Sequence, residues 1–167
     1  MASQTAFSKI DELIGQAIAE GVFPGAAYAI GKGGKVVHMG AAGRFMYCPD
    51  SVVTEVSTIW DMASCSKVMG ATPAAMVLVD EGKMKLDEPV AKVLPEFGRE
   101  GKEKITPRNL LLHDSGLAAD LHDVPQYTSA EQFMEAVYAS GLEYETGSKT
   151  VYSDLSMIVL GKMVEKI

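Results

Sequence analysis

The sequence predicts an α+β protein, in which one helix and a β-hairpin precede a mostly helical region. Apolar residues recur at helical spacing in residues 7–20. Two short apolar runs flank a glycine-rich turn at residues 31–34, as in a hairpin. Beyond residue 63 the apolar pattern is helical again. We therefore expect two regions, residues 1–63 with the hairpin and residues 64–167 with the helices.

The first helix and the hairpin have clear boundaries. The helix ends before Gly21 and the Pro24-Gly25 pair, which interrupt the periodic pattern. Its apolar stripe consists of Phe7, Ile10, Leu13, Ile14, Ala17 and Ile18. Two strands with one helix are marginally stable alone, and the sequence contains no further convincing strand. We therefore expect the chain to be an incomplete part of a protein with a larger sheet.

The first helix of the second region should extend from Ser64 to about Glu81. Pro73 lies inside it and should kink it, because proline has no backbone N–H to donate. Gly82 follows the last periodic residue and suits the position of positive φ that ends many helices.

Three further helices are predicted after a segment of turns. Residues 83–104 should form short turns over the surface, because they are punctuated by Pro89, Pro95, Gly98 and Gly101. Thr106 is a predicted N-cap, with Pro107 at the first helical position. Thr128 or Ser129 should open the next helix. The last helix should pack through Leu155, Ile158, Val159, Met163 and Ile167.

Composition and charge exclude several classes of function. The chain of 167 residues has a formal net charge of −7 and no basic run, so we expect no nucleic-acid partner. No stretch approaches the roughly 20 apolar residues of a membrane span. The N-terminus lacks the apolar core of a secretory signal, which favours the cytoplasm unless a signal was removed. Cys48 and Cys65 lack zinc-ligand spacing, and the histidines His38, His113 and His122 do not cluster, so we expect neither metal nor cofactor.

The stretch DMASCSKVMG at residues 61–70 places a hydroxyl and an amine three residues apart. On a helix these positions share one face, so Lys67 could reach Ser64. Ser64 would lie at the helix start, where unpaired N–H groups and the helix dipole favour developing negative charge. Small and apolar neighbours would partly desolvate Lys67 and lower its pKa. The alternative is an ordinary polar helix face, because this spacing also arises by chance.

A second polar group, Tyr152-Ser153-Asp154, immediately precedes the last predicted helix. From a loop, a tyrosine and a polar side chain two residues on can enter one cleft. The alternative is that Tyr152 packs at the helix start and Asp154 is the N-cap.

A third stretch, HDSG at residues 113–116, contains the residue types of a catalytic triad. Neighbours in sequence rarely converge with triad geometry, and the G-x-S-x-G elbow is missing. We expect instead a turn after a helix, in which His113 bonds nearby backbone.

Four blocks of the sequence, in the expected order, resemble the serine β-lactamase and penicillin-binding-protein family. The likeness is to its branch of class C β-lactamases, D-amino-acid peptidases and esterases. The blocks are FPGAAYAIGKGGKVVHMGAAG, IWDMASCSKVMGATPAAMVLVDEGKMKLDEPVAKVLPEF, ITPRNLLLHDSGL and VYSDLSMIVLGKMVEKI. The resemblance implies the β-lactamase/transpeptidase-like fold, with residues 1–63 as the N-terminal part of its α/β subdomain. Residues 64–167 would form the helical subdomain that carries the nucleophile helix.

The resemblance also implies that part of the family's fold lies outside this chain. Members of the family carry a Lys/His-x-Gly strand near the C-terminus, and no such strand follows here. We therefore expect the N-terminal part of a hydrolase, either as a shortened or cleaved chain or as one piece of a two-chain assembly.

By resemblance, Ser64 would be the nucleophile that forms an acyl-enzyme with a small ester, amide or β-lactam substrate. Lys67 and Tyr152 would together take and return its proton, and the Ser64 backbone N–H would be an oxyanion donor. Asp154 stands where the family often has Asn, and its carboxylate would keep Lys67 charged and shift the pH optimum upward. The alternatives are a non-catalytic binding protein and a chain that is inactive without a complementary C-terminal chain.

Overall fold

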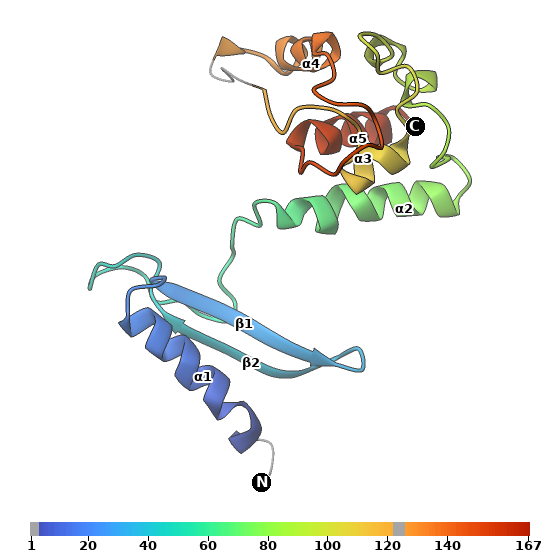
Figure 1. Cartoon of the computed structure of the whole chain (residues 1–167). Coiled ribbons are helices and arrows are strands. Elements are labelled where there is room, and N and C mark those ends of the chain that lie inside the picture. Colours follow the sequence, from blue (N-terminus) through green and yellow to red (C-terminus); the bar gives the residue numbers. More distant parts are fainter. Residues whose placement is uncertain (1–3, 122–125) are drawn as a thin grey trace. The chain divides into compact units, whose positions relative to one another are not determined.

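The computed structural model describes residues 4–121 and 126–167, so His122 lies outside the described residues. The chain divides into two compact units, Met1–Asp61 and Met62–Ile167 (Figure 1). Within the described ranges the first unit contains one helix and a two-stranded sheet, and the second contains helices only. The protein is therefore α+β, as predicted. Across the same ranges, no helix combines the length and the apolar character that crossing a bilayer requires.

In the first unit, helix α1 (Gln4–Ala19) packs against an antiparallel hairpin. The hairpin consists of β1 (Gly25–Lys32) and β2 (Lys35–Gly43). The two turn residues, Gly33 and Gly34, have φ values of 58° and 72°. This conformation matches the right-handed twist of the strands, and glycine adopts it without strain. The predicted helix and hairpin are confirmed.

Polar and aromatic side chains hold α1 to the hairpin. The Tyr28 hydroxyl donates to Asp11 Oδ1 at 2.6 Å, and His38 Nε2 lies 2.7 Å from the same oxygen. The Phe7 ring stacks on the His38 ring with 4.9 Å between centroids. The hydrogen bond from Tyr28, and then that from His38, lowers the pKa of the Asp11 carboxyl.

In the second unit, the predicted helix that contains Pro73 is divided into two parts. A π-helical segment, η1 (Lys67–Ala71), precedes α2 (Thr72–Asp80). The Thr72 N–H donates to the Lys67 carbonyl, five residues back, so this turn is wider than an α-helical turn. It lies directly before Pro73, which has no N–H for the helical hydrogen bond. The predicted irregularity is therefore a widened turn.

Gly82 directly follows the C-terminal end of helix α2, as the sequence predicts. Gly82 has a φ of 71°. Its N–H donates to the Val79 carbonyl at 3.0 Å, and the Lys83 N–H donates to the Leu78 carbonyl at 2.9 Å. These two bonds form a Schellman motif, which satisfies carbonyls that the helix leaves unpaired.

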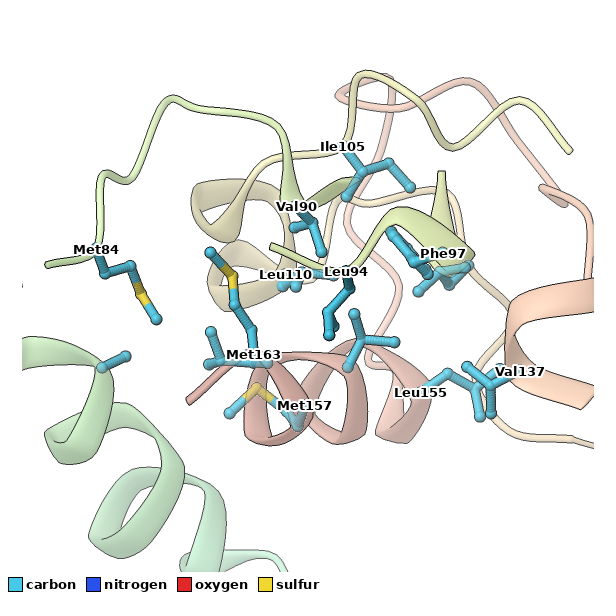
Figure 2. Packing of buried hydrophobic residues seen from close by; sticks show 14 residues of the cluster. Met84, Val90, Leu94, Phe97, Ile105, Leu110, Val137, Leu155, Met157 and Met163 are labelled. Atoms are coloured by element: carbon cyan, nitrogen blue, oxygen red, sulfur yellow. The ribbon is translucent and has the colours of Figure 1, made fainter. Parts of the chain in front are cut away.

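The core of the second unit forms around α5 (Asp154–Lys166), as Figure 2 shows in part. Helix α3 (Pro107–Leu112) packs against α5, and α4 (Ala130–Ala139) contributes Val137 to the same cluster. The predicted stripe is buried at Leu155, Val159 and Met163. At the end of the helix, Ile167 remains 39% exposed.

Residues 83–104 are not only the surface turns that the sequence predicts. They contain two single turns of 3-10 helix, η2 (Val90–Lys92) and η3 (Pro95–Phe97). These turns bring apolar side chains into the core, namely Val90, Leu94 and Phe97 (Figure 2). The prediction was wrong for these residues, because prolines that begin tight turns can also direct neighbouring side chains inward.

Thr106 caps α3 through reciprocal hydrogen bonds. Its Oγ1 accepts from the Asn109 N–H at 3.3 Å, and Asn109 Oδ1 accepts from the Thr106 N–H at 3.0 Å. This arrangement is a capping box, and it confirms the predicted N-cap.

Because α3 packs on α5, Thr106→Ala should lower the free energy of unfolding by about 1 kcal/mol. Urea denaturation followed by circular dichroism measures this change. Thr150→Ala is the matched control, since Thr150 is exposed; it should change the free energy by less than about 0.5 kcal/mol. Equal effects of the two substitutions would contradict the capping role.

Candidate active site

All four residues singled out from the sequence for the site lie in the second unit. Ser64 is in the turn that leads into η1, and Lys67 is the first residue of η1. Tyr152 lies two residues before α5, and Asp154 is the first residue of α5. Because η1 contacts α5, these residues come together although they are far apart in the sequence.

A tight turn presents Ser64 to this site. The Ser66 N–H donates to the Ala63 carbonyl at 3.0 Å, and the Lys67 N–H donates to the Ser64 carbonyl at 3.1 Å. Ala63 has a φ of 42°, in the left-handed region that non-glycine residues rarely adopt. Strain of this kind persists only where the surrounding structure imposes it, often at functional sites.

The amine of Lys67 is at the centre of the site. Its Nζ donates to Ser64 Oγ at 3.1 Å and lies 2.7 Å from Asp154 Oδ1. The same nitrogen lies 5.0 Å from the centroid of the Tyr152 ring. The Lys67 side chain is 17% exposed, so these contacts occur where water screens them only partly. One amine thus joins the hydroxyl, the carboxylate and the phenol.

The pKa of Lys67 is raised, in contrast to the lowering that partial desolvation predicts. The contact with the Asp154 carboxylate is the largest cause, and hydrogen bonding to Tyr152 adds to it. Burial acts in the opposite direction but is weaker. The expectation drawn from the apolar neighbours was wrong, whereas the expectation that Asp154 would keep Lys67 charged agrees with this direction. Lys67 is therefore held as an ammonium ion.

The pKa of Tyr152 is lowered. Hydrogen bonding to the Ser64 side chain is the largest cause, and hydrogen bonding to Lys67 is the next. Burial and the Asp154 charge oppose the shift. The Tyr152 residue is 55% exposed, so it remains open to a small molecule. The Ser64 and Lys67 side chains thus make the Tyr152 phenol more acidic than a free phenol.

Ser153, between Tyr152 and Asp154, fixes the beginning of α5. Its Oγ accepts from the Ser156 N–H at 3.1 Å and donates to the Ala118 carbonyl at 2.6 Å. The sequence alternative in which Asp154 caps the helix is therefore wrong, because Ser153 is the cap. This leaves the Asp154 carboxylate to face Lys67.

The HDSG stretch borders the site, but its members do not form a triad. The Asp114 carboxylate accepts from Asn109 Nδ2 at 2.9 Å. The Ser115 hydroxyl pairs with the Ser156 hydroxyl at 2.9 Å, and both residues are fully buried. The contact between the two serines joins the turn after α3 to the first turn of α5.

His113 was missed as a neighbour of the site. The predicted turn after a helix is confirmed, because His113 directly follows α3 with a φ of 56°. Its Nδ1 accepts from the Ser153 N–H at 3.1 Å, and its ring lies 4.7 Å from the Tyr152 ring. The backbone partner is 40 residues along the chain and not nearby, so local sequence carried no signal for this contact.

A hollow of about 310 Å³ opens beside these groups. Its lining consists of Ser66, Lys67, Ala71, Asp154, Met157 and Ile158. It offers an ammonium, a carboxylate and a hydroxyl next to apolar surface, which suits a small polar molecule. In the described ranges, no three side chains of His, Cys, Asp or Glu lie together in a way that could hold a metal ion.

Comparisons with known proteins identify the family and the fold of the chain. The family model described as Beta-lactamase matches residues 10–167. The N-acetylmuramyl-L-alanine amidase of Bacillus subtilis (strain 168) is 32% identical over 180 residues, which cover 95% of this chain. A crystal structure of a class C beta lactamase superposes with a TM-score of 0.82 at 26% identity over 98% of the chain. A penicillin-binding protein homolog from Caulobacter crescentus gives 0.78 at 26% identity over 96% of the chain.

The match covers only part of each of these proteins. The chain spans 40% of the Bacillus subtilis amidase, 45% of the class C beta lactamase and 44% of the Caulobacter crescentus homolog. Within that part, the family model extends over both units and over every residue of the candidate site. The chain therefore has the β-lactamase/transpeptidase-like fold and belongs to the beta-lactamase family.

Proposed function

We propose that the chain carries the nucleophile and the proton-transfer groups of a serine hydrolase that acts through an acyl-enzyme. The observation that carries the proposal is the convergence of Ser64, Lys67 and Tyr152. The Lys67 ammonium lies 3.1 Å from Ser64 Oγ and 5.0 Å from the centroid of the Tyr152 ring, and the Ser64 and Lys67 side chains lower the pKa of the phenol. A nucleophile and a base in mutual contact are the arrangement that covalent catalysis requires.

In the first step, Ser64 Oγ attacks the carbonyl carbon of an ester, amide or lactam. The Ser64 proton passes to Tyr152 in its phenolate form, which the lowered pKa of the phenol makes accessible. The tetrahedral intermediate then expels the alcohol or amine, which takes the proton from Tyr152, and the acyl group stays on Ser64. Water then attacks the acyl carbonyl and gives its proton to Tyr152. The proton passes on to Ser64 Oγ, so that the acid is released and the Ser64 hydroxyl is restored.

Lys67 has an electrostatic role in this scheme. Its raised pKa, which is due first to Asp154, keeps the amine positively charged at neutral pH. The positive charge stabilises the Tyr152 phenolate, and the hydrogen bond to Ser64 Oγ orients the hydroxyl. The Ser64 backbone N–H is proposed as one oxyanion donor.

The substrate class is proposed from the named relatives. They include an amidase, a class C beta-lactamase solved in complex with cefoxitin and a penicillin-binding protein homolog. An amide or β-lactam carbonyl therefore fits the site, and an ester reacts through the same acyl-enzyme. The hollow of about 310 Å³ beside Lys67 suits a small substrate that carries such a carbonyl group.

A second candidate is a chain that needs a complementary C-terminal chain for activity. It is favoured by the share of the relatives that the match leaves uncovered, since the chain spans 45% of the class C beta lactamase. Within the second unit, η1 and α2 also leave apolar side chains more than half exposed, namely Val68, Met69, Met76 and Val77. Burial of this face by further polypeptide would stabilise the assembly through the hydrophobic effect.

A fluorophosphonate or a fluorescent penicillin should label the chain at Ser64, with a mass increase of one acyl or phosphonyl group. Ser64→Ala should abolish the label, and Ser148→Ala is the matched control that should retain it, since Ser148 is exposed and does not line the hollow. Intact mass measurement followed by peptide mapping checks the site. A label that survives in Ser64→Ala would refute the assigned nucleophile.

Labelling also separates the two candidates. A folded chain that is labelled alone favours the self-sufficient hydrolase. Labelling only when a complementary C-terminal chain is co-produced favours the second candidate. A folded chain that stays unlabelled under both conditions would favour a non-catalytic binding protein.

The labelling rate should rise with pH, and in Asp154→Asn this rise should occur at lower pH than in the unaltered chain. Asp154 raises the pKa of Lys67, and its charge opposes the lowering of the pKa of Tyr152. Without that charge both groups lose protons at lower pH, so the phenolate is available earlier. Labelling rates between pH 5 and 10 measure the profile.

Glu145→Gln is the charge-matched control for Asp154→Asn. It also removes one negative charge, but Glu145 is exposed and belongs to the loop before Tyr152. Its profile should coincide with that of the unaltered chain. An unchanged profile in Asp154→Asn would remove the proposed role of the carboxylate.

A further inference from the structure

We propose that His113 is a positioning residue for Tyr152, which it holds against Ser64 and Lys67 through its ring and through the backbone on both sides of the tyrosine. This inference rests on the proposed function, in which Tyr152 accepts the serine proton. It assigns a role to a side chain that lies outside both motifs of the candidate site.

Three contacts connect His113 to the segment that carries Tyr152. The Val151 N–H donates to the His113 carbonyl at 2.8 Å. The Ser153 N–H donates to His113 Nδ1 at 3.1 Å. The ring centroids of His113 and Tyr152 are 4.7 Å apart, with 37° between the planes. Since the bonded backbone groups flank Tyr152, one residue fixes the chain before it, the chain after it and one face of its ring.

The backbone of His113 gives an independent reason to assign a role to its side chain. Its φ of 56° is a left-handed conformation, and the Asp114 N–H donates to the Asn109 carbonyl at 3.1 Å to close the end of α3. Glycine adopts this conformation without the steric cost that a Cβ atom brings. A residue needed only to end the helix would therefore be better as glycine, so the imidazole accounts for the histidine.

The hydrogen bond from Ser153 also determines the charge state that the contact requires. Nδ1 accepts it, so the proton of the neutral ring is on Nε2. Three groups face the ring: the Lys67 ammonium, the Asp154 carboxylate and the Tyr152 phenol. Burial first, and then the Lys67 charge, lowers the pKa of His113, while Asp154 opposes this. The His113 ring thus stays neutral down to a lower pH than a free imidazole does. Protonation at still lower pH would remove Nδ1 as the acceptor for the Ser153 N–H.

The test follows the titration of Tyr152 and of the Ser153 amide by NMR. Tyrosine ring-carbon resonances report the phenol, and Tyr152→Phe assigns the signal. In His113→Gly, the pKa of Tyr152 should rise by about one unit, the change that loss of one hydrogen bond produces. In His113→Asn it should remain near the starting value, because Asn tolerates positive φ and its Oδ1 can replace Nδ1 as acceptor.

The unaltered chain provides a second test that needs no substitution. As pH falls, the Ser153 amide resonance should shift together with the ring resonances of His113, because protonation of Nδ1 breaks their hydrogen bond. His113→Asn should abolish this shift. His38→Asn is the matched control from the first unit, where His38 contacts Asp11, and it should leave the Ser153 and Tyr152 titrations unchanged.

Two results would overturn the proposal. One is an equal Tyr152 titration in the unaltered chain and in a folded His113→Gly variant. The other is a Ser153 amide resonance that does not shift while His113 titrates in the unaltered chain. This second result can be obtained even if the glycine variant does not fold. Circular dichroism establishes folding, and the Tyr138 and Tyr144 signals show whether a change is confined to Tyr152.

These measurements do not depend on acylation, so failure of the two proposals can be told apart. Absence of a label at Ser64 with intact titrations would count against the proposed function only. Where Ser64 is labelled, His113→Gly should slow the labelling about tenfold at neutral pH, as expected for one lost hydrogen bond. His113→Asn should restore most of the rate.

Discussion

The ion pair between Lys67 and Asp154, with 2.7 Å between Nζ and Oδ1, is the contact on which the candidate site depends. It joins the first residue of η1 to the first residue of α5, and so brings two segments of distant sequence together. It also determines the charge of the amine, because the carboxylate raises the pKa of Lys67 against the effect of burial. The ion pair therefore sets both the position and the charge of the amine that contacts Ser64 and Tyr152.

That ion pair is effective because the beginning of α5 is held rigidly by the residues beneath it. Ser153 caps the helix and bonds the Ala118 carbonyl, and Ser156 pairs with Ser115 in the interior. One residue beyond Asp154, Leu155 is fully buried in the core (Figure 2). A satisfied buried polar network of this kind specifies one arrangement, because breaking any member would leave an unpaired group in a dry environment.

The features that could be predicted from the sequence are those that depend on near neighbours. The cap at Thr106 and the helix end at Gly82 each involve residues within a few positions, and both were found. Ser64, Lys67 and Tyr152 were named through motifs, and the structure brings them together, although their roles remain proposals. The contact of His113 with Ser153 was missed because the partner is distant. The fully buried Lys102, whose amine bonds the Ser140 carbonyl, likewise has no local signature.

The widened turn at η1 limits the number of residues that this stretch of the chain can contain. An α-helix advances about 100° for each residue, whereas the π turn accommodates an extra residue without displacing the rest of the helix. Shortening Lys67–Ala71 by one position would restore regular winding, whereas lengthening it by one position would rotate everything upstream relative to α2. The amine would then leave its partners on α5. Insertions in this stretch should therefore be tolerated far less well than conservative exchanges, since no side chain can compensate for a changed helix phase.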